Sequence, residues 1–272
     1  MEFAGKVVFI TGGGGGIGGG IAAAFAERGA RIVLADVNVT HAEEEAAKLP
    51  LQADVLVAHL DVTDARSWST ACHQVEDSFG PVDILCNNAG ISSGFKPLVN
   101  TPSDEFDRLM SINVKGVYNG ICAVAPAMMA RGSGHIVNTS SMNGLNPFGT
   151  FAAYSASKFA VLGLSDAVRQ ELAPFGIGVS TLFPGLTRSR MSESATDGPI
   201  AQNPERAASI RANMMEPLWL GRAVVRAIEA NEPYIITHPE YATDTKARFE
   251  EILMAFGDPA QPGYRSGHSA TA

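Results

Sequence analysis

The feature that most restricts the fold of this chain is a run of glycines near its N-terminus. The apolar segment Lys6–Thr11 leads directly into Gly12–Gly16, and a helical pattern, Ile17–Arg28, begins at once after it. Glycines at such a junction let the backbone approach a pyrophosphate, and free N–H groups at the helix N-terminus attract that anion. An isolated glycine run is as often a flexible loop. The strand–loop–helix order favours a dinucleotide-binding loop.

Short apolar runs alternate with longer helical patterns along the rest of the chain. Continuous apolar strands separated by helices indicate right-handed crossovers and a parallel sheet covered on both faces. We therefore predict an α/β fold with a doubly wound parallel sheet of about seven strands. The predicted strands are Lys6–Thr11, Arg31–Asp36, Leu56–Leu60, Asp83–Cys86, His135–Thr139, Ile177–Phe183 and Tyr234–Thr237. The predicted helices are Ile17–Arg28, His41–Leu49, Ser67–Phe79, Ser103–Met129, Phe151–Ala173, Leu218–Ala230 and Asp244–Phe256.

No fixed-period repeat and no linker divides the sequence, so we predict one domain over residues 1–272. In the longest predicted helix, Ser103 is placed to cap the first turn and Pro126 to bend the last. A polar stretch near 186–208 interrupts the pattern, and the segment 186–215 is predicted to form a substrate lid. The polar tail from Gly257 onward is expected to be loose.

Composition argues against several classes of partner. The formal net charge is −8 and no basic run is present, which disfavours nucleic acid and anionic membranes. No apolar run reaches the ~18 residues of a membrane span, and the first apolar run is too short for a signal peptide. Widely spaced Cys72, Cys86 and Cys122 predict reduced thiols, and the six histidines form no ligand cluster. We expect a soluble cytoplasmic protein without a metal site.

Asp36 ends the second predicted strand, 18 residues after Gly18 (36 − 18). A carboxylate at this position can accept both ribose hydroxyls of an adenosine, and it repels a 2′-phosphate. No Lys or Arg stands in the glycine loop or directly after Asp36 to hold such a phosphate. These features favour NAD over NADP, although an aspartate at a strand end can also be merely solvated.

Several motifs now stand in the order typical of one enzyme family. The glycine loop, Asp61-Val62, the run Asn87–Gly90 and the turn Pro184-Gly185 occur together with Ser141 and Tyr154-x-x-x-Lys158. Over roughly residues 4–190 the chain resembles the classical short-chain dehydrogenase/reductase superfamily. The resemblance implies a Rossmann fold and an NAD site made of Gly12, Gly15, Gly16, Ile17, Gly18, Asp36, Val37, Asp61, Val62, Asn88, Ala89, Gly90, Tyr154, Lys158, Pro184, Gly185, Thr187 and Ser189.

Tyr154 and Lys158 are four residues apart on a predicted helix and therefore share one face. A free tyrosine has a pKa of ~10, and a nearby ammonium lowers that value. Alone, such a pair is more often partly solvated surface. The resemblance makes Tyr154 the general acid/base of hydride transfer between NAD and a secondary alcohol or ketone. Lys158 then lowers the tyrosine pKa and binds the nicotinamide ribose.

The same resemblance assigns two further catalytic residues. It places a serine about 13 residues before the tyrosine, which selects Ser141 over Ser140 to orient the substrate oxygen (154 − 13). It also places Asn113 in a proton relay to Lys158.

The sequence after Pro184 departs from the family pattern. Thr187 and Ser189 replace a usual aliphatic residue and a threonine, and both hydroxyls can still bond the nicotinamide amide. Met191, Met214 and Met215 are available for an apolar or aromatic substrate pocket, although ordinary packing by methionine is the commoner role. The candidate substrate residues are Asn143, Phe151 and Met191.

The C-terminal segment also differs from many family members. Pro233–Pro239 stands where a Val-Asp-Gly-Gly-like segment usually helps to build a tetramer. Homodimer and homotetramer both stay open. The ending is similar to that of bacterial members that oxidise aryl-carbinol groups of lignin-type aromatics, so the expected partner is a small alcohol or ketone.

Other functions on the same fold were weighed against this one. The principal alternative is a catalytically silent NAD-binding regulator, which has no physical need for Ser141, Tyr154 and Lys158 together. Extended relatives that epimerise or dehydrate sugars carry a larger C-terminal domain than this chain can supply. Enoyl reductases of the fold usually separate tyrosine and lysine by more than four residues.

Overall fold

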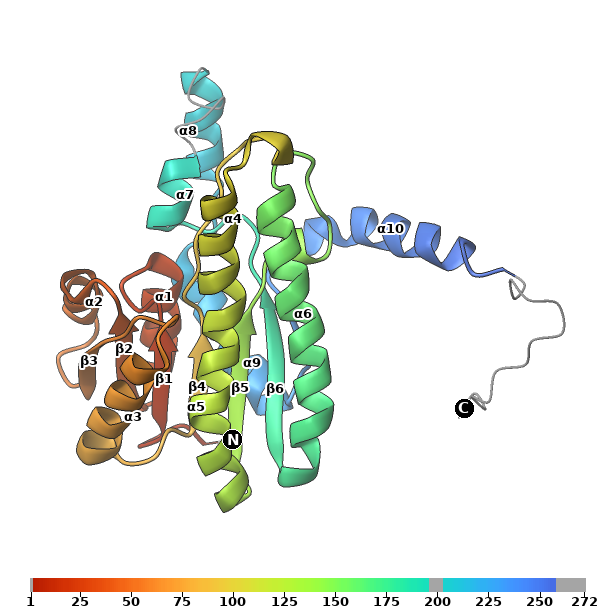
Figure 1. Ribbon diagram of the computed structural model, residues 1–272. Coiled ribbons are helices and arrows are strands. Elements are labelled where there is room, and N and C mark those ends of the chain that lie inside the picture. Colours follow the sequence, from red (N-terminus) through yellow and green to blue (C-terminus); the bar gives the residue numbers. More distant parts are fainter. Residues whose placement is uncertain (1, 196–202, 258–272) are drawn as a thin grey trace, which may run out of the picture. The chain divides into compact units, whose positions relative to one another are not determined.

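A computed structural model describes residues 2–195 and 203–257. One parallel sheet in the strand order β3-β2-β1-β4-β5-β6-β7 runs through the described part of the chain (Figure 1). Its strands are β1 (Val7–Thr11), β2 (Arg31–Asp36), β3 (Val55–His59), β4 (Ile84–Asn87), β5 (Gly134–Thr139), β6 (Ile177–Phe183) and β7 (Tyr234–Ile236). The predicted doubly wound α/β fold is confirmed.

Helices cover both faces of this sheet, and each covered face has its own apolar core. The helices α3, α5 and α6 pack on one face, and α1, α2 and α9 pack on the other. Their bounds are α1 (Gly16–Ala26), α2 (Val39–Ala46), α3 (Ala65–Phe79), α5 (Gly116–Arg131), α6 (Ala152–Leu172) and α9 (Pro217–Ala230).

Strand β1 shows why the sequence signal was a continuous apolar run. Val7 and Phe9 face the core under α3 and α5, whereas Val8 and Ile10 face the core under α1 and α9. Because side chains alternate along a strand, a strand buried on both faces must be apolar at every position.

The strand order reverses at β1, which pairs with β2 on one side and with β4 on the other. The crossovers therefore leave in opposite directions from this point, and a crevice forms beyond the carboxyl ends of the two central strands. The glycine loop follows β1, and Asn88 follows β4. The fold thus brings both predicted cofactor motifs to one crevice.

The predicted long helix from Ser103 is interrupted. It consists of α4 (Ser103–Met110), a π-helical segment (Ser111–Lys115) and α5, which continues through Pro126 to Arg131. The expected cap was wrong, because Pro102 holds the cap position and no side chain bonds there. The irregular turn lies at Ser111–Lys115 rather than at Pro126. Such turns cluster at functional sites, and this one carries Asn113.

The predicted lid segment leaves and rejoins the body of the fold at one place. Met215 N–H donates to the carbonyl of Leu186 at 3.0 Å, and Arg188 N–H donates to the carbonyl of Met215 at 3.0 Å. Between these contacts lie two helices that the sequence patterns did not indicate, α7 (Arg190–Ala195) and α8 (Pro204–Ala212). Residues 196–202 of the predicted lid lie outside the described residues.

The chain divides into two compact units, Met1–His238 and Pro239–Ala272. The described part of the second contains a short 3₁₀ turn and α10 (Ala242–Met254). Further 3₁₀ turns in the first unit are Leu98–Asn100, Met142–Gly144 and Ala173–Phe175. The predicted loose tail lies outside the described residues from 258 onward. The single domain over 1–272 stays a prediction.

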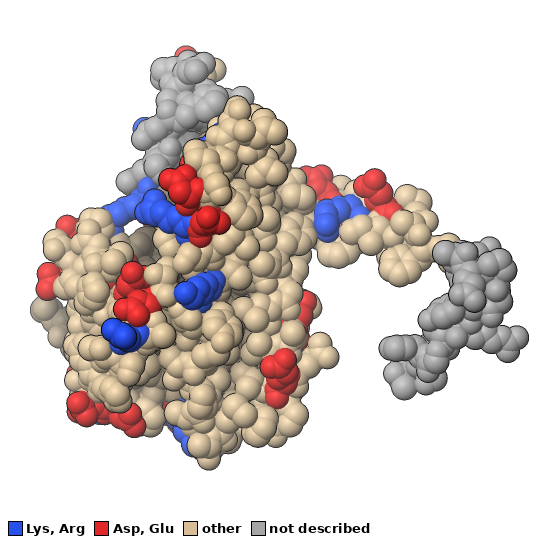
Figure 2. Space-filling view, in the orientation of Figure 1, with Lys and Arg blue, Asp and Glu red and all other residues tan. Residues whose placement is uncertain are grey.

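Several surface and thiol features follow from the described residues. Basic and acidic side chains are interspersed on the face that Figure 2 shows, without an extended patch of one sign. No helix in residues 2–195 and 203–257 is long and apolar enough to cross a bilayer. Cys72, Cys86 and Cys122 are free thiols, and burial raises the pKa of Cys86 to about 12.

Candidate active site

The glycine loop has a shape that side chains would destroy. Gly12 has φ +64°, and a Cβ there would lie 2.8 Å from Ala89 Cα. A Cβ on Gly18 would lie 2.4 Å from the carbonyl oxygen of Gly12. Helix α1 begins at Gly16, and no side chain caps its N-terminus at Gly15. The loop therefore presents bare backbone and free N–H groups, which fits the pyrophosphate of a dinucleotide.

The loop after β4 is tied to the glycine loop through Thr11. The Thr11 hydroxyl accepts hydrogen bonds from the N–H groups of Asn88 and Ala89, at 2.9 and 3.0 Å. The Asn88 amide in turn donates to the carbonyls of Thr11 and Gly12, at 3.1 and 3.3 Å. These bonds fix two neighbouring strand ends against each other, so the crevice between them has a defined width.

Asp36 is positioned by backbone donors on two sides. Its Oδ2 accepts from Gly14 N–H and its Oδ1 from Asn38 N–H, both at 2.9 Å. The carboxylate is half-buried at the end of β2, and the following Val37 is exposed. Because each carboxylate oxygen has two lone pairs, acceptor capacity is left for ribose hydroxyls.

The pair Asp61-Val62 follows β3, and protein hydrogen bonds hold both residues in place. The Asp61 carboxylate accepts from the N–H and the hydroxyl of Thr63, at 2.8 and 2.7 Å. The carbonyl of Val62 accepts from Trp68 Nε1 at 3.1 Å and from the Asn119 amide at 2.8 Å. Both residues are thus rigidly held.

Tyr154 and Lys158 lie on successive turns of α6, and Lys158 is almost completely buried. The ammonium lies 5.6 Å from the centroid of the Tyr154 ring and donates to the carbonyl of Thr139 at 3.0 Å. Burial lowers the pKa of Lys158 to about 8. At neutral pH the side chain therefore keeps its positive charge close to the phenol.

The expected effect on the tyrosine is not present in this arrangement. Burial raises the pKa of Tyr154, and a hydrogen bond with Ser141 opposes that increase. Desolvation of the buried phenol is the larger of these two effects, and the Lys158 ammonium donates to the carbonyl of Thr139. The pKa of Tyr154 therefore lies above its ordinary value, which contradicts the lowered value expected from Lys158.

Ser141 lies at the carboxyl end of β5 with an extended backbone. Its hydroxyl accepts from Asn143 N–H at 3.2 Å and donates to the carbonyl of Pro184 at 3.5 Å. It also bonds to Tyr154. Ser140 has a different role, because its hydroxyl donates to the backbone carbonyl of Lys158 at 2.8 Å and so ties α6 to the strand end.

Asn113 is fully buried in the π-helical segment. Its Oδ1 accepts from Ile91 N–H at 2.8 Å, and its Nδ2 donates to the carbonyl of Ile91 and to Ser157 Oγ, at 2.9 and 3.0 Å. A Cβ on Gly90 would lie 3.2 Å from Asn113 Oδ1 and 3.4 Å from Lys158 Nζ. The structure thus brings the predicted relay residue and the lysine together around Gly90.

The Pro184-Gly185 turn has a partner that the sequence patterns missed. His238 Nδ1 accepts from Gly185 N–H at 3.0 Å, and the imidazole is almost completely buried. A Cβ on Gly185 would lie 2.5 Å from His238 Cγ. The pairing of Phe183 with Ile236 places His238 beside the turn, because it sets the ends of β6 and β7 side by side.

Thr187 and Ser189 are both near this turn, and their hydroxyls have protein partners. Thr187 Oγ1 donates to the carbonyl of Gly185 at 3.3 Å. Ser189 Oγ lies 3.3 Å from Ser192 Oγ, and Ser189 N–H donates to Ser192 Oγ at 2.8 Å. These bonds hold the first residues of the lid in a compact turn.

Aromatic rings line the approach to Tyr154. The centroid of Phe151 lies 6.1 Å from that of Tyr154, and the ring of Phe95 lies 4.3 Å from Phe151. Phe95 was not predicted, because it reaches the site from the loop after β4. Asn143 Oδ1 accepts from the hydroxyl of Ser155, the residue after Tyr154, at 3.3 Å.

The three methionines of the predicted lid differ in how far their side chains are exposed. Met191 is 36% exposed, whereas Met214 is buried and Met215 packs against the core under α1 and α9. Of the three, Met191 is therefore the one whose side chain is available to a ligand.

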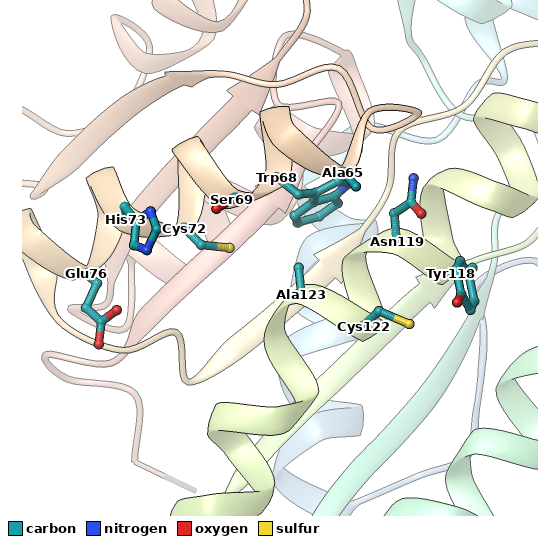
Figure 3. A pocket seen from close by; sticks show the side chains of 10 residues that line it. All are labelled: Ala65, Trp68, Ser69, Cys72, His73, Glu76, Tyr118, Asn119, Cys122 and Ala123. Atoms are coloured by element: carbon teal, nitrogen blue, oxygen red, sulfur yellow. The ribbon is translucent and has the colours of Figure 1, made fainter.

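A separate groove of about 520 Å³ lies between α3 and α5 (Figure 3). Trp68, Cys72 and His73 line it from α3, and Tyr118 and Cys122 line it from α5. None of the predicted catalytic or cofactor residues lines this groove. Among residues 2–195 and 203–257, no group of His, Cys, Asp or Glu is arranged to hold a metal ion.

Comparison with known proteins decides the family. The family model described as short chain dehydrogenase matches residues 6–199. The chain belongs to this family. It is therefore an oxidoreductase, and the family binds a nicotinamide cofactor. The motif resemblance found in the sequence is confirmed.

Individual relatives agree with the family match. The C alpha-dehydrogenase of Sphingobium sp. is 35% identical, over 93% of this chain and 87% of that protein. The solved structure of LigO in its apo form, from Sphingobium sp., is 35% identical, covers 94% of this chain and 90% of that chain, and has a TM-score of 0.82. The solved structure of a short chain dehydrogenase/reductase from Burkholderia phymatum in complex with NAD is 28% identical. It covers 96% of this chain and 99% of that chain, with a TM-score of 0.85.

Proposed function

We propose that this oxidoreductase transfers a hydride between NAD and a secondary alcohol or ketone whose carbinol carries an aromatic or other apolar group. The observation that carries the proposal is the convergence of Ser141, Tyr154 and Lys158 beside the bare glycine loop. The cofactor supplies the hydride acceptor or donor. The chain must then hold the substrate oxygen and move one proton.

Tyr154 is the proposed group that gives or takes this proton, and Ser141 orients the substrate oxygen next to it. The existing bond between the two hydroxyls supports this proposal, because it brings them close enough for one substrate oxygen to contact both. Lys158 keeps its charge at neutral pH and favours the phenolate as it forms, and it is also the proposed ribose ligand. Asn113, held beside Lys158 around Gly90, is the proposed relay residue.

The aromatic preference rests on the rings around the tyrosine. Phe151 lies in ring contact with the proposed catalytic phenol, and Phe95 packs against Phe151, so both offer apolar faces near it. The relative described as a C alpha-dehydrogenase supports the same choice. Asn143 and Met191 complete the proposed substrate residues.

The proposed preference for NAD rests on Asp36. Two backbone N–H groups orient its carboxylate at the end of β2, where it can accept from the ribose hydroxyls. The Burkholderia relative, whose structure holds NAD, supports this choice. We further propose that the protein acts in the cytoplasm as a homodimer or homotetramer, a single 1–272 domain per subunit.

The direct test measures NADH absorbance with benzylic, alicyclic, hydroxysteroid and acyl-thioester substrates, each with NAD and with NADP. The expected result is turnover with benzylic alcohols or aryl ketones and NAD. Tight NADH binding without turnover on any substrate would favour the silent regulator instead. Turnover confined to acyl thioesters or to NADP would contradict the proposed substrate class or cofactor.

A further inference from the structure

Arg190 reaches from the first turn of the lid to the glycine loop. Its Nη1 donates to the carbonyl of Gly14, and its Nη2 donates to Glu44 Oε2 at 2.5 Å. Nη1 also lies 3.7 Å from Glu45 Oε1. The bond to Gly14 joins residues 176 positions apart. A guanidinium therefore stands at the loop although the neighbouring sequence supplies no cation.

The carbonyl that Arg190 binds belongs to the residue that orients Asp36. Gly14 N–H donates to Asp36 Oδ2, and a Cβ on Gly14 would lie 3.0 Å from that oxygen. Arg190 thus binds the carbonyl of Gly14, and Asp36 binds the N–H of the same residue. The guanidinium is therefore linked through one residue to the carboxylate proposed to select the adenosine ribose.

Helix α2 supplies the acidic partners of this guanidinium. Glu45 has only 10% of its side chain exposed and is bound by Lys48 at 2.8 Å. Glu44 is 52% exposed and has Arg190 as its ion-pair partner. Glu44 is consequently the carboxylate whose removal most directly takes away the negative charge paired with Arg190. A released guanidinium is suited to a phosphate, because its planar fork of donors matches phosphate oxygens.

We propose that Arg190 is a specificity-determining residue for the adenosine half of the cofactor, and that Glu44 keeps the site selective against a 2′-phosphate by pairing with it. This inference rests on the proposed NAD function and adds a second determinant to Asp36. Asp36 repels the phosphate, while Glu44 withholds the cation that would bind it. The two effects act on the same group from different elements.

The test is a fluorescence titration of the full-length protein with NADPH and NADH at low ionic strength. Glu44→Ala is compared with Glu43→Ala, which removes the same charge from the same helix at a position that forms no ion pair with Arg190 in the described structure. The expected result is a fall of about fivefold in the NADPH Kd of Glu44→Ala alone, with the NADH Kd within about twofold. The gain should shrink as salt rises.

A second substitution tests whether the gain in NADPH affinity comes from the unpaired Arg190 guanidinium or only from the loss of a negative charge. In Glu44→Ala combined with Arg190→Gln, the gain in NADPH affinity should disappear. If NADPH binding to the wild-type chain is too weak to titrate, the whole series is measured in an Asp36→Asn background.

Two results would overturn the inference. One is equal NADPH affinity in Glu44→Ala and Glu43→Ala, and the other is a gain that persists without Arg190. Failure of the wild-type protein to bind NADH would instead overturn the proposed function, and this inference with it, so the two failures can be told apart.

Discussion

The two ends of the parallel sheet use buried polar groups differently, and two histidines show the contrast. At the amino end, His135 is the second residue of β5 and bonds to Ser180 Oγ at 2.8 Å. At the carboxyl end, His238 follows β7 and accepts from Gly185 N–H in the Pro184-Gly185 turn. Both are almost completely buried. Position along the strands, rather than burial, decides which polar group shapes the site.

Other polar residues at the amino and carboxyl ends of the sheet show the same contrast. Asp83, at the amino end, accepts from Lys6 Nζ at 3.1 Å and Val7 N–H at 3.0 Å, which joins two strands. Ser141 and Asp36, at the carboxyl end, keep acceptor capacity beyond their protein bonds. Changes at the carboxyl end should therefore affect cofactor or substrate, and changes at the amino end should affect stability.

Ser141→Ala should give the largest effect in this comparison. Loss of the hydroxyl proposed to orient the substrate oxygen should lower kcat by about 10³-fold, with NADH affinity nearly unchanged. The measurement is steady-state turnover together with an NADH titration. Ser140→Ala is the matched control for position, and its main effect should be on thermal stability, because that hydroxyl ties α6 to the strand end. A fall in turnover as large in Ser140→Ala would contradict the assignment.

His135 predicts an acid-dependent loss of stability at the other end. Burial, with a smaller contribution from Arg169, lowers the pKa of His135 from 6.5 to about 4. Between these values the unfolded chain binds a proton that the folded protein does not bind. Stability should therefore fall as the pH drops from 6.5 to about 4, by about 3 kcal/mol in total.

Urea unfolding across this pH range checks the effect of His135. His135→Gln keeps a hydrogen-bonding group but has no such titration, so its stability should vary less with pH. An unchanged slope in His135→Gln would show that other groups cause the acid dependence. NADH affinity of the folded variant should match the wild type.

His238→Ala should give a smaller effect, and on the cofactor rather than on acid stability. It leaves the Gly185 N–H without its acceptor and should weaken NADH binding by about five- to tenfold. His238→Asn is the control, because its Oδ1 can replace the Nδ1 acceptor and should restore most of the affinity. Equal NADH Kd values in His238→Ala and the wild type would remove His238 from the site.

The sequence predicted the parts of this molecule that are local. The sheet, the glycine loop and the Tyr154–Lys158 pair depend on strand burial, one turn and one helical repeat, all of which leave a pattern in adjacent residues. Arg190, His238 and Phe95 leave no such pattern, because their partners come from distant elements. The direction of the Tyr154 pKa was also beyond the sequence, since it depends on how deeply α6 buries the phenol.

The central claim is that Tyr154 moves the proton of an NAD-linked redox reaction. Tyr154→Phe keeps the ring beside Phe151 and removes only the hydroxyl, so single-turnover NADH formation can be measured alongside NADH binding. We expect the rate to fall by about 10³-fold or more while the NADH Kd stays within about twofold. NADH formation at the wild-type rate in Tyr154→Phe would contradict it.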